Sequence, residues 1–135
     1  MLRCVRATAL TATTLLFLAS TASAWAQAAV HRSFTAKTLR GELTVVQAPE
    51  ALINGAPVRL APGVRIRGET NLLLLSASLS GQALLVHYTL EDQTGLVREV
   101  WVLNPTEKAN QPWPTTLQEA ASWRFDPGSQ TWSLP

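Results

Sequence analysis

ALLVHYTL and LVREVWVL, residues 83–90 and 96–103, form the most regular pattern in this chain. Apolar residues recur at every second position along the first arm, which is the period of a strand with one buried face. The segment DQTG, residues 92–95, lies between the arms, and Gly95 suits a left-handed bulge position. The two arms therefore predict a β-hairpin with a three-residue loop in which Glu91 lies opposite Gly95.

This loop also predicts a register for the hairpin. The even-numbered residues of the first arm, Leu84 to Leu90, should form one strongly apolar face with Val102, Val100, Arg98 and Leu96. On the other face we expect His87 opposite Glu99 and Leu85 opposite Trp101. A hairpin with one apolar face is suited to the wall of a barrel or sandwich.

Further strand and turn signals precede the hairpin. Residues 41–46, GELTVV, are the first strand candidate, and residues 51–60 have the pattern of a second hairpin. The dipeptide Asn54-Gly55 can take both positive-φ positions of a type I′ turn. We expect the next turn at Pro62-Gly63, followed by a strand with one exposed face over residues 64–68.

The segment Leu72–Leu75 is ambiguous. Four consecutive leucines show no period of two, and either a buried strand or a short helix could use them. We expect a short buried segment that ends at Ser80-Gly81. If these leucines were exposed instead, they would form a site for a partner.

Composition changes after Asn104. Residues 105–135 contain five prolines and three tryptophans, and Thr116 with Glu119 has the spacing of a capping box. We expect a short helix from Thr116 to Arg124. The tryptophans of this Pro/Trp-rich segment should pack it on the outside of the β domain.

About six strands with closely spaced turns predict a mainly β fold, a small antiparallel barrel. The expected organisation is a signal peptide (1–26), a flexible lead-in (27–38), a β-barrel domain (39–104) and the packed C-terminal segment (105–135). About 109 residues remain after cleavage, which suffices for one domain.

The N-terminal segment has the pattern of a secretory signal peptide. Arg3 and Arg6 precede an apolar run, and small residues follow it, with cleavage after Ala24 or Ala26. We expect a periplasmic or secreted protein without a transmembrane segment after cleavage. Cys4, the only cysteine in the sequence, lies in this segment, so the exported chain would contain no disulfide.

The charge balance indicates no nucleic-acid partner. The full chain has 11 basic and 9 acidic residues, and two of the basic residues belong to the predicted signal peptide. The exported chain would therefore be neutral, whereas nucleic-acid-binding domains are usually basic.

No pattern in the sequence indicates an enzyme, a metal or a cofactor. The exported chain has no cysteine and no Gly-x-Ser-x-Gly motif. His31 and His87 are far apart in sequence, and neither has a carboxylate at a ligand spacing.

Two features are candidates for ligand binding. Arg59, Arg65 and Arg67 alternate with apolar residues and would place guanidinium groups on one strand face, where they suit anionic groups. Trp113, between two prolines, is the tryptophan least easily explained by packing, and tryptophans concentrate binding energy at interfaces.

Several segments resemble a group of small exported proteins of Gram-negative bacteria, mostly uncharacterised. These segments are RGELT (40–44), LING (52–55), RLAPGVRIR (59–67) and GLVREVWVL (95–103). The strand rhythm is also similar to that of OB- or SH3-like barrels. The resemblance implies an exported periplasmic protein and transfers no catalytic residue.

From these features we expect a non-enzymatic binding or assembly module of the cell envelope with an envelope protein as partner. The alternative is a binder of an envelope glycan or a small anionic ligand that uses the arginine face and the C-terminal tryptophans.

Overall fold

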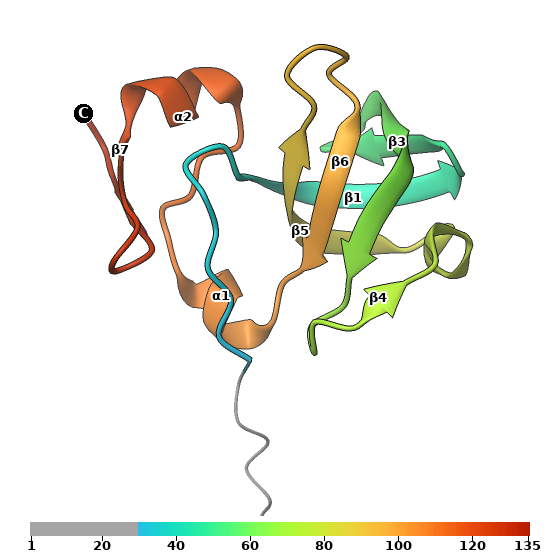
Figure 1. The fold of residues 1–135 in the computed structure, drawn as a ribbon, viewed down its shortest axis with the longest axis horizontal. Helices are drawn as coiled ribbons and strands as arrows, with labels where there is room; N and C mark the ends of the chain where they lie inside the picture. Colours follow the sequence, from blue (N-terminus) through green and yellow to red (C-terminus); the bar gives the residue numbers. More distant parts are fainter. Residues whose placement is uncertain (1–29) are drawn as a thin grey trace, which may run out of the picture.

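The computed structural model describes residues 30–135. The predicted signal peptide and the first three residues of the lead-in lie outside the described residues. The elements are β1 (Leu39–Gln47), β2 (Glu50–Ile53), β3 (Ala56–Arg67), β4 (Leu73–Leu74), the 3-10 helix η1 (Ser76–Leu79), β5 (Ala83–Leu90), β6 (Val97–Val102), α1 (Pro105–Ala109), α2 (Leu117–Ser122), β7 (Arg124–Asp126) and β8 (Thr131–Ser133). The prediction of a mainly β fold is confirmed (Figure 1).

Strands β1 to β6 form one six-stranded sheet, in the order β2-β1-β5-β6-β3-β4. Strand β2 also pairs with β3. The hydrogen-bonded pairings therefore run in a closed circuit through β1, β2, β3, β6 and β5, and β4 is attached to β3 outside this circuit.

The sheet is mixed, whereas the sequence had predicted antiparallel pairing throughout. Strands β3 and β6 are parallel, and the other pairings are antiparallel. A closed circuit of five strands cannot alternate in direction at every step, because five is odd. One parallel pair is therefore a necessary consequence of closing this circuit.

Two turn predictions had different outcomes. Asn54 and Gly55 both have positive φ, 52° and 78°, and join β2 to β3 as a two-residue turn, as predicted. No turn ends the strand at Pro62-Gly63, because β3 continues to Arg67. Gly63 has φ 75° and lies at an irregularity of β3. Residues 56–59 pair with β2, Leu60 and residues 65–67 pair with β6, and residues 66–67 also pair with β4.

The hairpin of β5 and β6 is confirmed, but its register differs from the predicted one by two residues. His87 lies opposite Trp101, not Glu99, and Val86 lies opposite Val102. Gly95 has the expected positive φ of 70°, and the Glu91 amide donates to the Leu96 carbonyl. A shift of two keeps every side chain on its predicted face. Thr89 lies opposite Glu99 and Leu90 lies opposite Val97, so Arg98 is an extra residue of β6 without a partner in the register. Its side chain is exposed.

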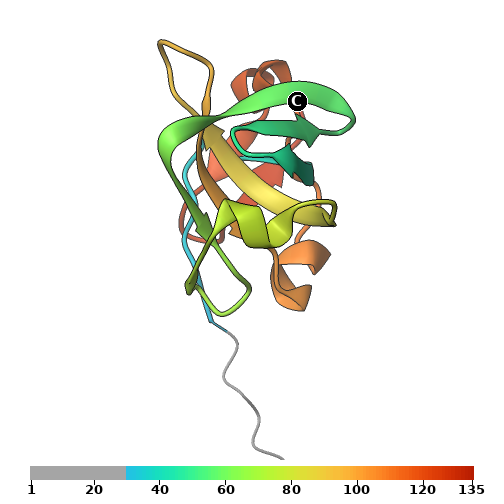
Figure 2. The ribbon, with the colours of Figure 1, turned by 90° about the vertical axis from the view of Figure 1, so that its right-hand side faces the viewer.

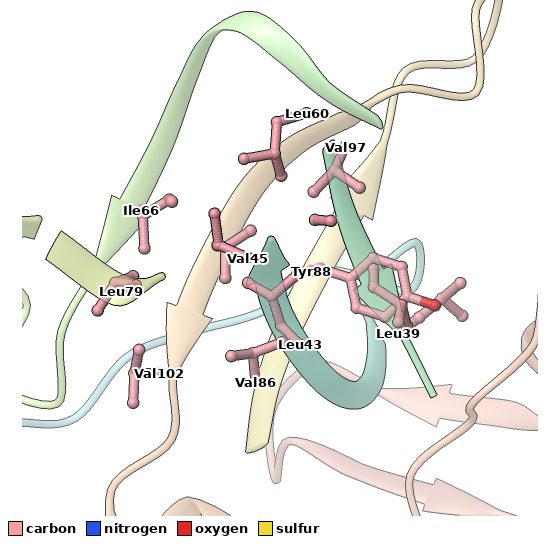
Figure 3. Close-up of a cluster of buried hydrophobic side chains, with 13 residues drawn as sticks. Leu39, Leu43, Val45, Leu60, Ile66, Leu79, Val86, Tyr88, Val97 and Val102 are labelled. Carbon is pink, nitrogen blue, oxygen red and sulfur yellow. The ribbon is translucent and has the colours of Figure 1, made fainter. Parts of the chain in front are cut away.

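The main core lies inside the circuit (Figure 3). All five strands of the circuit and η1 contribute to it, and several of its side chains are almost completely buried. The cluster consists of Leu39, Leu43, Val45, Ala51, Ile53, Leu60, Ile66, Leu79, Val86, Tyr88, Val97, Val100 and Val102. Alternate residues of the strands supply this cluster, as the period of two predicts.

The leucine segment is exposed, which corrects the prediction that it is buried. The exposed fractions of Leu72, Leu73 and Leu75 are 69%, 66% and 79%, and that of Leu74 is 36%. Within this segment only Leu73 and Leu74 form a strand, β4, at the end of the sheet. Leu79 of η1, and not one of these four leucines, packs in the main core. Figure 2 shows β4 and η1 in yellow-green on the side facing the viewer.

A second apolar cluster lies outside the circuit. Phe34, Trp113 and Trp132 are buried there, with Trp101, Ala120, Trp123 and Phe125 packed against them. Figure 1 shows residues 30–38, in blue to cyan, running between the strands and the C-terminal segment. Part of the lead-in predicted to be flexible is therefore packed, since Arg32, Phe34 and Thr38 are buried.

Two short helices flank this second cluster. Thr116 caps α2 by accepting a hydrogen bond from the Glu119 amide, so the predicted C-terminal helix is present, two residues shorter at its end. Helix α1 was not predicted. It begins at Pro105 with Asn104 as its cap, and Asn104 and Glu107 form a complete capping box.

Candidate functional site

The three predicted arginines do not converge on one pocket. Arg59 is exposed and forms an ion pair of 3.6 Å with Glu50 of β2. Arg65 lies beyond the bend at Gly63 and is next to Glu99 in the register of β3 and β6. Each of the two therefore has its own acidic neighbour, on a different part of the strand.

Arg67 lies at one end of a row of outward-facing residues that crosses four strands. Arg40 of β1 is opposite His87 of β5, His87 is opposite Trp101 of β6, and Trp101 is opposite Arg67 of β3. Outward strand positions are normally solvated. In the middle of this row, however, the lead-in and the C-terminal segment cover His87, and its exposed fraction is 1%.

Arg59 and Arg65 line two separate surface pockets, and Trp113 lies at a third cavity, which is more aromatic. The exposed fraction of Trp113 is 4%, and its Nε1 donates a hydrogen bond of 2.9 Å to the Thr38 carbonyl. Its ring stacks on the His87 imidazole with centroids 4.2 Å apart, and Phe34 contacts the same imidazole edge-on at 4.4 Å. Packing against these two rings explains the position of Trp113, and the cavity exposes part of its surface.

The cavity has a volume of about 300 Å³ and lies where the lead-in, β5, α1 and the C-terminal turn meet. Its wall is both aromatic and polar. The side chains that matter for its chemistry are Arg32, Phe34, His87, Asn104, Glu107 and Trp113. None of the three predicted arginines belongs to this lining.

Arg32 and Glu107 form a buried, bidentate ion pair in the cavity wall. The Arg32 Nε donates to Oε1 of Glu107 at 2.8 Å, and Nη2 donates to Oε2. The guanidinium also donates to the carbonyls of Gly68 and Val102. Such planar pairs are among the strongest charged hydrogen bonds in proteins. This pair fixes the lead-in to the start of α1.

Arg40 contacts the His87 ring and is not itself part of the cavity lining. Its Nε and Nη2 are 3.1 and 3.0 Å from Nε2 of His87. The guanidinium donates its other hydrogen bonds to the carbonyls of Glu107 and Asn110, at the end of α1. Within residues 30–135, no carboxylate lies within ion-pair distance of this guanidinium.

The contact with Arg40 determines the protonation of His87. A guanidinium can only donate, so Nε2 must be the unprotonated acceptor, and the proton of the neutral ring must be on Nδ1. Burial, reinforced by the positive charges of Arg40 and Arg32, lowers the pKa of His87 to about 2. The imidazole is therefore neutral at ordinary pH and presents one N–H donor.

That donor has no protein partner in the described part of the chain. Nδ1 of His87 is buried without a hydrogen-bond partner among residues 30–135. An unsatisfied buried N–H costs about 1–3 kcal/mol. Because Nδ1 has almost no accessible surface, this cost is part of the packing of the ring between Phe34 and Trp113.

Sequence reasoning missed Arg32, Arg40 and Glu107. One local signal for Glu107 was present, since Asn104-Pro105-Thr106-Glu107 has a cap residue, a proline at the first helical position and a glutamate at the third. The two arginines gave no local signal, because the partners of their side chains are 36 to 75 residues away in sequence.

The part of the chain that the structure describes offers neither a metal cluster nor a membrane-spanning helix. Residues 30–135 contain no cluster of three or more His, Cys, Asp or Glu side chains that could hold a metal ion. His31 and His87 do both line the cavity, although they are distant in sequence. None of the helices in residues 30–135 is long and apolar enough to span a membrane.

Comparisons of the chain with models of protein families, with curated proteins and with solved structures give no match.

Proposed function

We propose that this chain is a non-enzymatic binding or assembly module of the cell envelope, exported to the periplasm and bound to an envelope protein through Leu72–Leu75. The observation that carries the proposal is the exposure of these four consecutive leucines at the end of the sheet. Contiguous exposed apolar side chains are typical of interaction sites. The signal-peptide pattern and the resemblance to small exported proteins support the location.

Site-specific crosslinking in the cell tests this proposal. A photo-crosslinking residue at Leu73 or Leu75 should capture one envelope protein reproducibly, and a Leu73→Ser/Leu75→Ser double variant should lose that protein in co-purification. Leu117 is the matched control, since it is 61% exposed but lies on α2, far from β4 (Figure 1). The same capture pattern from Leu117 and Leu75 would refute the proposal.

We propose further that the closed circuit of strands is a small barrel of the OB type. The five strands, the single parallel pair of β3 and β6, and the short helix between β3 and β5 support it. An OB-fold is a five-stranded Greek-key barrel that serves as a binding scaffold. An experimental structure that lacks either the β2–β3 or the β3–β6 pairing would overturn this assignment.

A second candidate function is binding of an envelope glycan or a small anionic ligand. The cavity favours it, since Trp113 lies in its wall and two buried arginines lie in or behind that wall. The binding site that we propose is therefore this cavity and not the strand face of Arg59, Arg65 and Arg67. Peptidoglycan fragments and acidic glycans should quench the tryptophan fluorescence; unchanged fluorescence with all of them would count against a glycan ligand.

A further inference from the structure

We propose that the envelope partner adds an extended segment to β4 as a further strand, with acidic side chains on the face of Arg67 and apolar side chains on the opposite face. The inference rests on the protein-partner function proposed for Leu72–Leu75, and it names the binding mode and the chemistry of the partner. It is independent of the cavity, because these leucines do not belong to the cavity lining.

The first argument is the open edge of the sheet. Within residues 30–135, β4 is the one strand of the six-stranded sheet that has a neighbouring strand on one side only. The pairing of β2 with β3 closes the other five strands into the circuit. Figure 1 shows β4 on the outer side of β3. Leu73 and Leu75 are largely exposed, so the described chain leaves this edge uncovered.

The second argument is the direction of the backbone groups at this edge. The Leu72 carbonyl accepts a hydrogen bond of 2.8 Å from the Gly68 amide, directly after β3. Hydrogen-bonded and non-hydrogen-bonded residues alternate along an antiparallel strand. The N–H and C=O groups of Leu73 and the N–H group of Leu75 therefore point away from β3. An incoming strand can pair with these groups, whereas the Leu75 carbonyl already accepts from the Ser78 amide.

The third argument is that the sequence of this edge does not prevent pairing. Natural sheets protect exposed edges with charged residues, prolines, bulges or a covering element. Residues 72–75 are four leucines, without a charge or a proline, and Leu75 continues the extended backbone of β4 with φ −80° and ψ 133°. Such an edge suits the addition of a strand from a partner, which is a common mode of peptide recognition.

The fourth argument is the charge beside the edge. Arg67 of β3 lies opposite Leu73 on the outward face of the sheet. It forms no ion pair within residues 30–135, and Glu69, the nearest carboxylate along the chain, is exposed. Strands lie about 4.8 Å apart, so a carboxylate on the added strand would be within reach of this long side chain. The alternate side chains of that strand would meet Leu72 and Leu74 on the opposite face.

Calorimetric titration of the full chain, expressed with its own N-terminal segment and purified from the envelope fraction, tests the pairing. The first probe is a capped eight-residue peptide in which valine and glutamate alternate, and the second has lysine in place of glutamate. We expect the glutamate peptide to bind at least about tenfold more tightly, because only its side chains can accept from Arg67. The glutamate peptide with N-methylated backbone amides keeps its side chains but loses its amide donors, and it should not bind.

Two variants locate the binding at β4. Leu73→Pro removes an N–H that points away from β3, and proline is tolerated at such edge positions. This variant should lose the glutamate peptide, whereas Leu73→Val keeps the N–H and should bind it as the wild type does. In Arg67→Gln, the preference for the glutamate peptide over the lysine peptide should disappear. In the wild type, the glutamate peptide should slow hydrogen exchange of the Leu73 and Leu75 amides, a signal that does not require any variant to fold.

Three results of the titrations would overturn the proposal. These are no binding of the glutamate peptide to the folded protein, equal binding of its N-methylated form, and unchanged binding to a folded Leu73→Pro variant. Each of them would mean that the backbone of β4 does not pair with an added strand.

Crosslinking from Leu75 in the cell separates this inference from the function on which it rests. If the wild type and Leu73→Pro capture the same envelope protein equally well, the partner binds the leucine side chains alone. The inference then fails, and the proposed function stands. If the wild type captures no envelope protein, the proposed function fails and the inference fails with it. Capture of a second copy of this chain alone would also overturn the inference, because β4 would then pair with itself.

Discussion

The Arg40 guanidinium donates to Nε2 of His87 across adjacent strands, with N–N distances of 3.1 and 3.0 Å. The pair lies on the outer face of the sheet, under the lead-in and the C-terminal segment. Arginine and histidine could both carry a positive charge, and the geometry permits only one of them to do so. The stability of the covering segments is therefore linked to the proton occupancy of one imidazole.

Acid should weaken the fold through His87. Its pKa is about 2 in the folded protein and about 6.5 in an unfolded chain, so the unfolded chain binds more protons between these values. The contribution of His87 to stability is complete above pH 6.5 and decreases as the pH falls towards 2, by up to about 1.4 kcal/mol per pH unit.

Urea denaturation at pH 7, 6, 5 and 4 measures this slope. Arg40, Arg32 and Glu107 are the charged groups around the ring, so the wild-type slope needs a reference that lacks the imidazole. The comparison with His87→Gln isolates the histidine. A variant with the same slope as the wild type between pH 6.5 and 5 would contradict the assignment.

Removal of the charge on Glu107 should destabilise the protein strongly. In Glu107→Gln, the Arg32 guanidinium would remain buried without its counter-charge, and breaking a buried pair costs about 3 kcal/mol or more. The midpoint of urea denaturation reports the loss. Glu69→Gln, a change at an exposed position, should stay within about 0.5 kcal/mol of the wild type; equal effects of the two variants would show that the pair contributes no stability.

A methyl group at Gly41 should destabilise the fold, because it would be too close to neighbouring atoms. A Cβ there would lie 2.9 Å from Cγ2 of Ile53 and 3.2 Å from Nδ2 of Asn54. Gly41→Ala should cost about 1–3 kcal/mol by overpacking. Gly128→Ala is a suitable control, because its Cβ would meet only an exposed Asp126 oxygen at 3.3 Å. Thermal denaturation of both variants tests the prediction, which an unchanged melting temperature of Gly41→Ala would refute.

Substitutions of Leu75 and Leu79 should change the stability of the protein by very different amounts. Leu75 is 79% exposed and Leu79 is 7% exposed. Leu79→Ala should cost about 2–5 kcal/mol, because it removes a side chain from the main core. Leu75→Ser should leave stability within about 0.5 kcal/mol of the wild type. A large loss for Leu75→Ser, measured by urea denaturation, would mean that the leucine segment contributes to the core.

Local patterns predicted the local features of the fold. Asn54-Gly55 indicated a two-residue turn because positive φ is favourable only for a few residue types, and the alternation in residues 83–90 indicated which side chains face the core. The register of the β5–β6 hairpin was wrong because it depends on loop length, and an extra residue at Arg98 alters the count. The leucine segment was misassigned because hydrophobicity alone does not determine burial at the end of a sheet.

Most residues of the candidate site could not be predicted from the sequence. Trp113 was selected from its prolines and its residue type, and it does line the cavity. The cluster of Arg32, Arg40, His87 and Glu107 depends on contacts between segments that become neighbours only after the circuit closes. Of these contacts, the capping box of Glu107 alone had a signature in adjacent residues.

The packing of the lead-in against the C-terminal segment has a consequence for biogenesis. The Phe34 amide donates to the side-chain oxygen of Gln130, 96 residues later, and the Gln130 amide donates back to the Phe34 carbonyl. A chain that emerges from its amino end cannot bury Phe34 until almost its last residues have arrived. Until then Phe34 and the neighbouring aromatic side chains are accessible to chaperones and proteases. A truncated chain that lacks Gln130 would therefore keep its lead-in exposed to them.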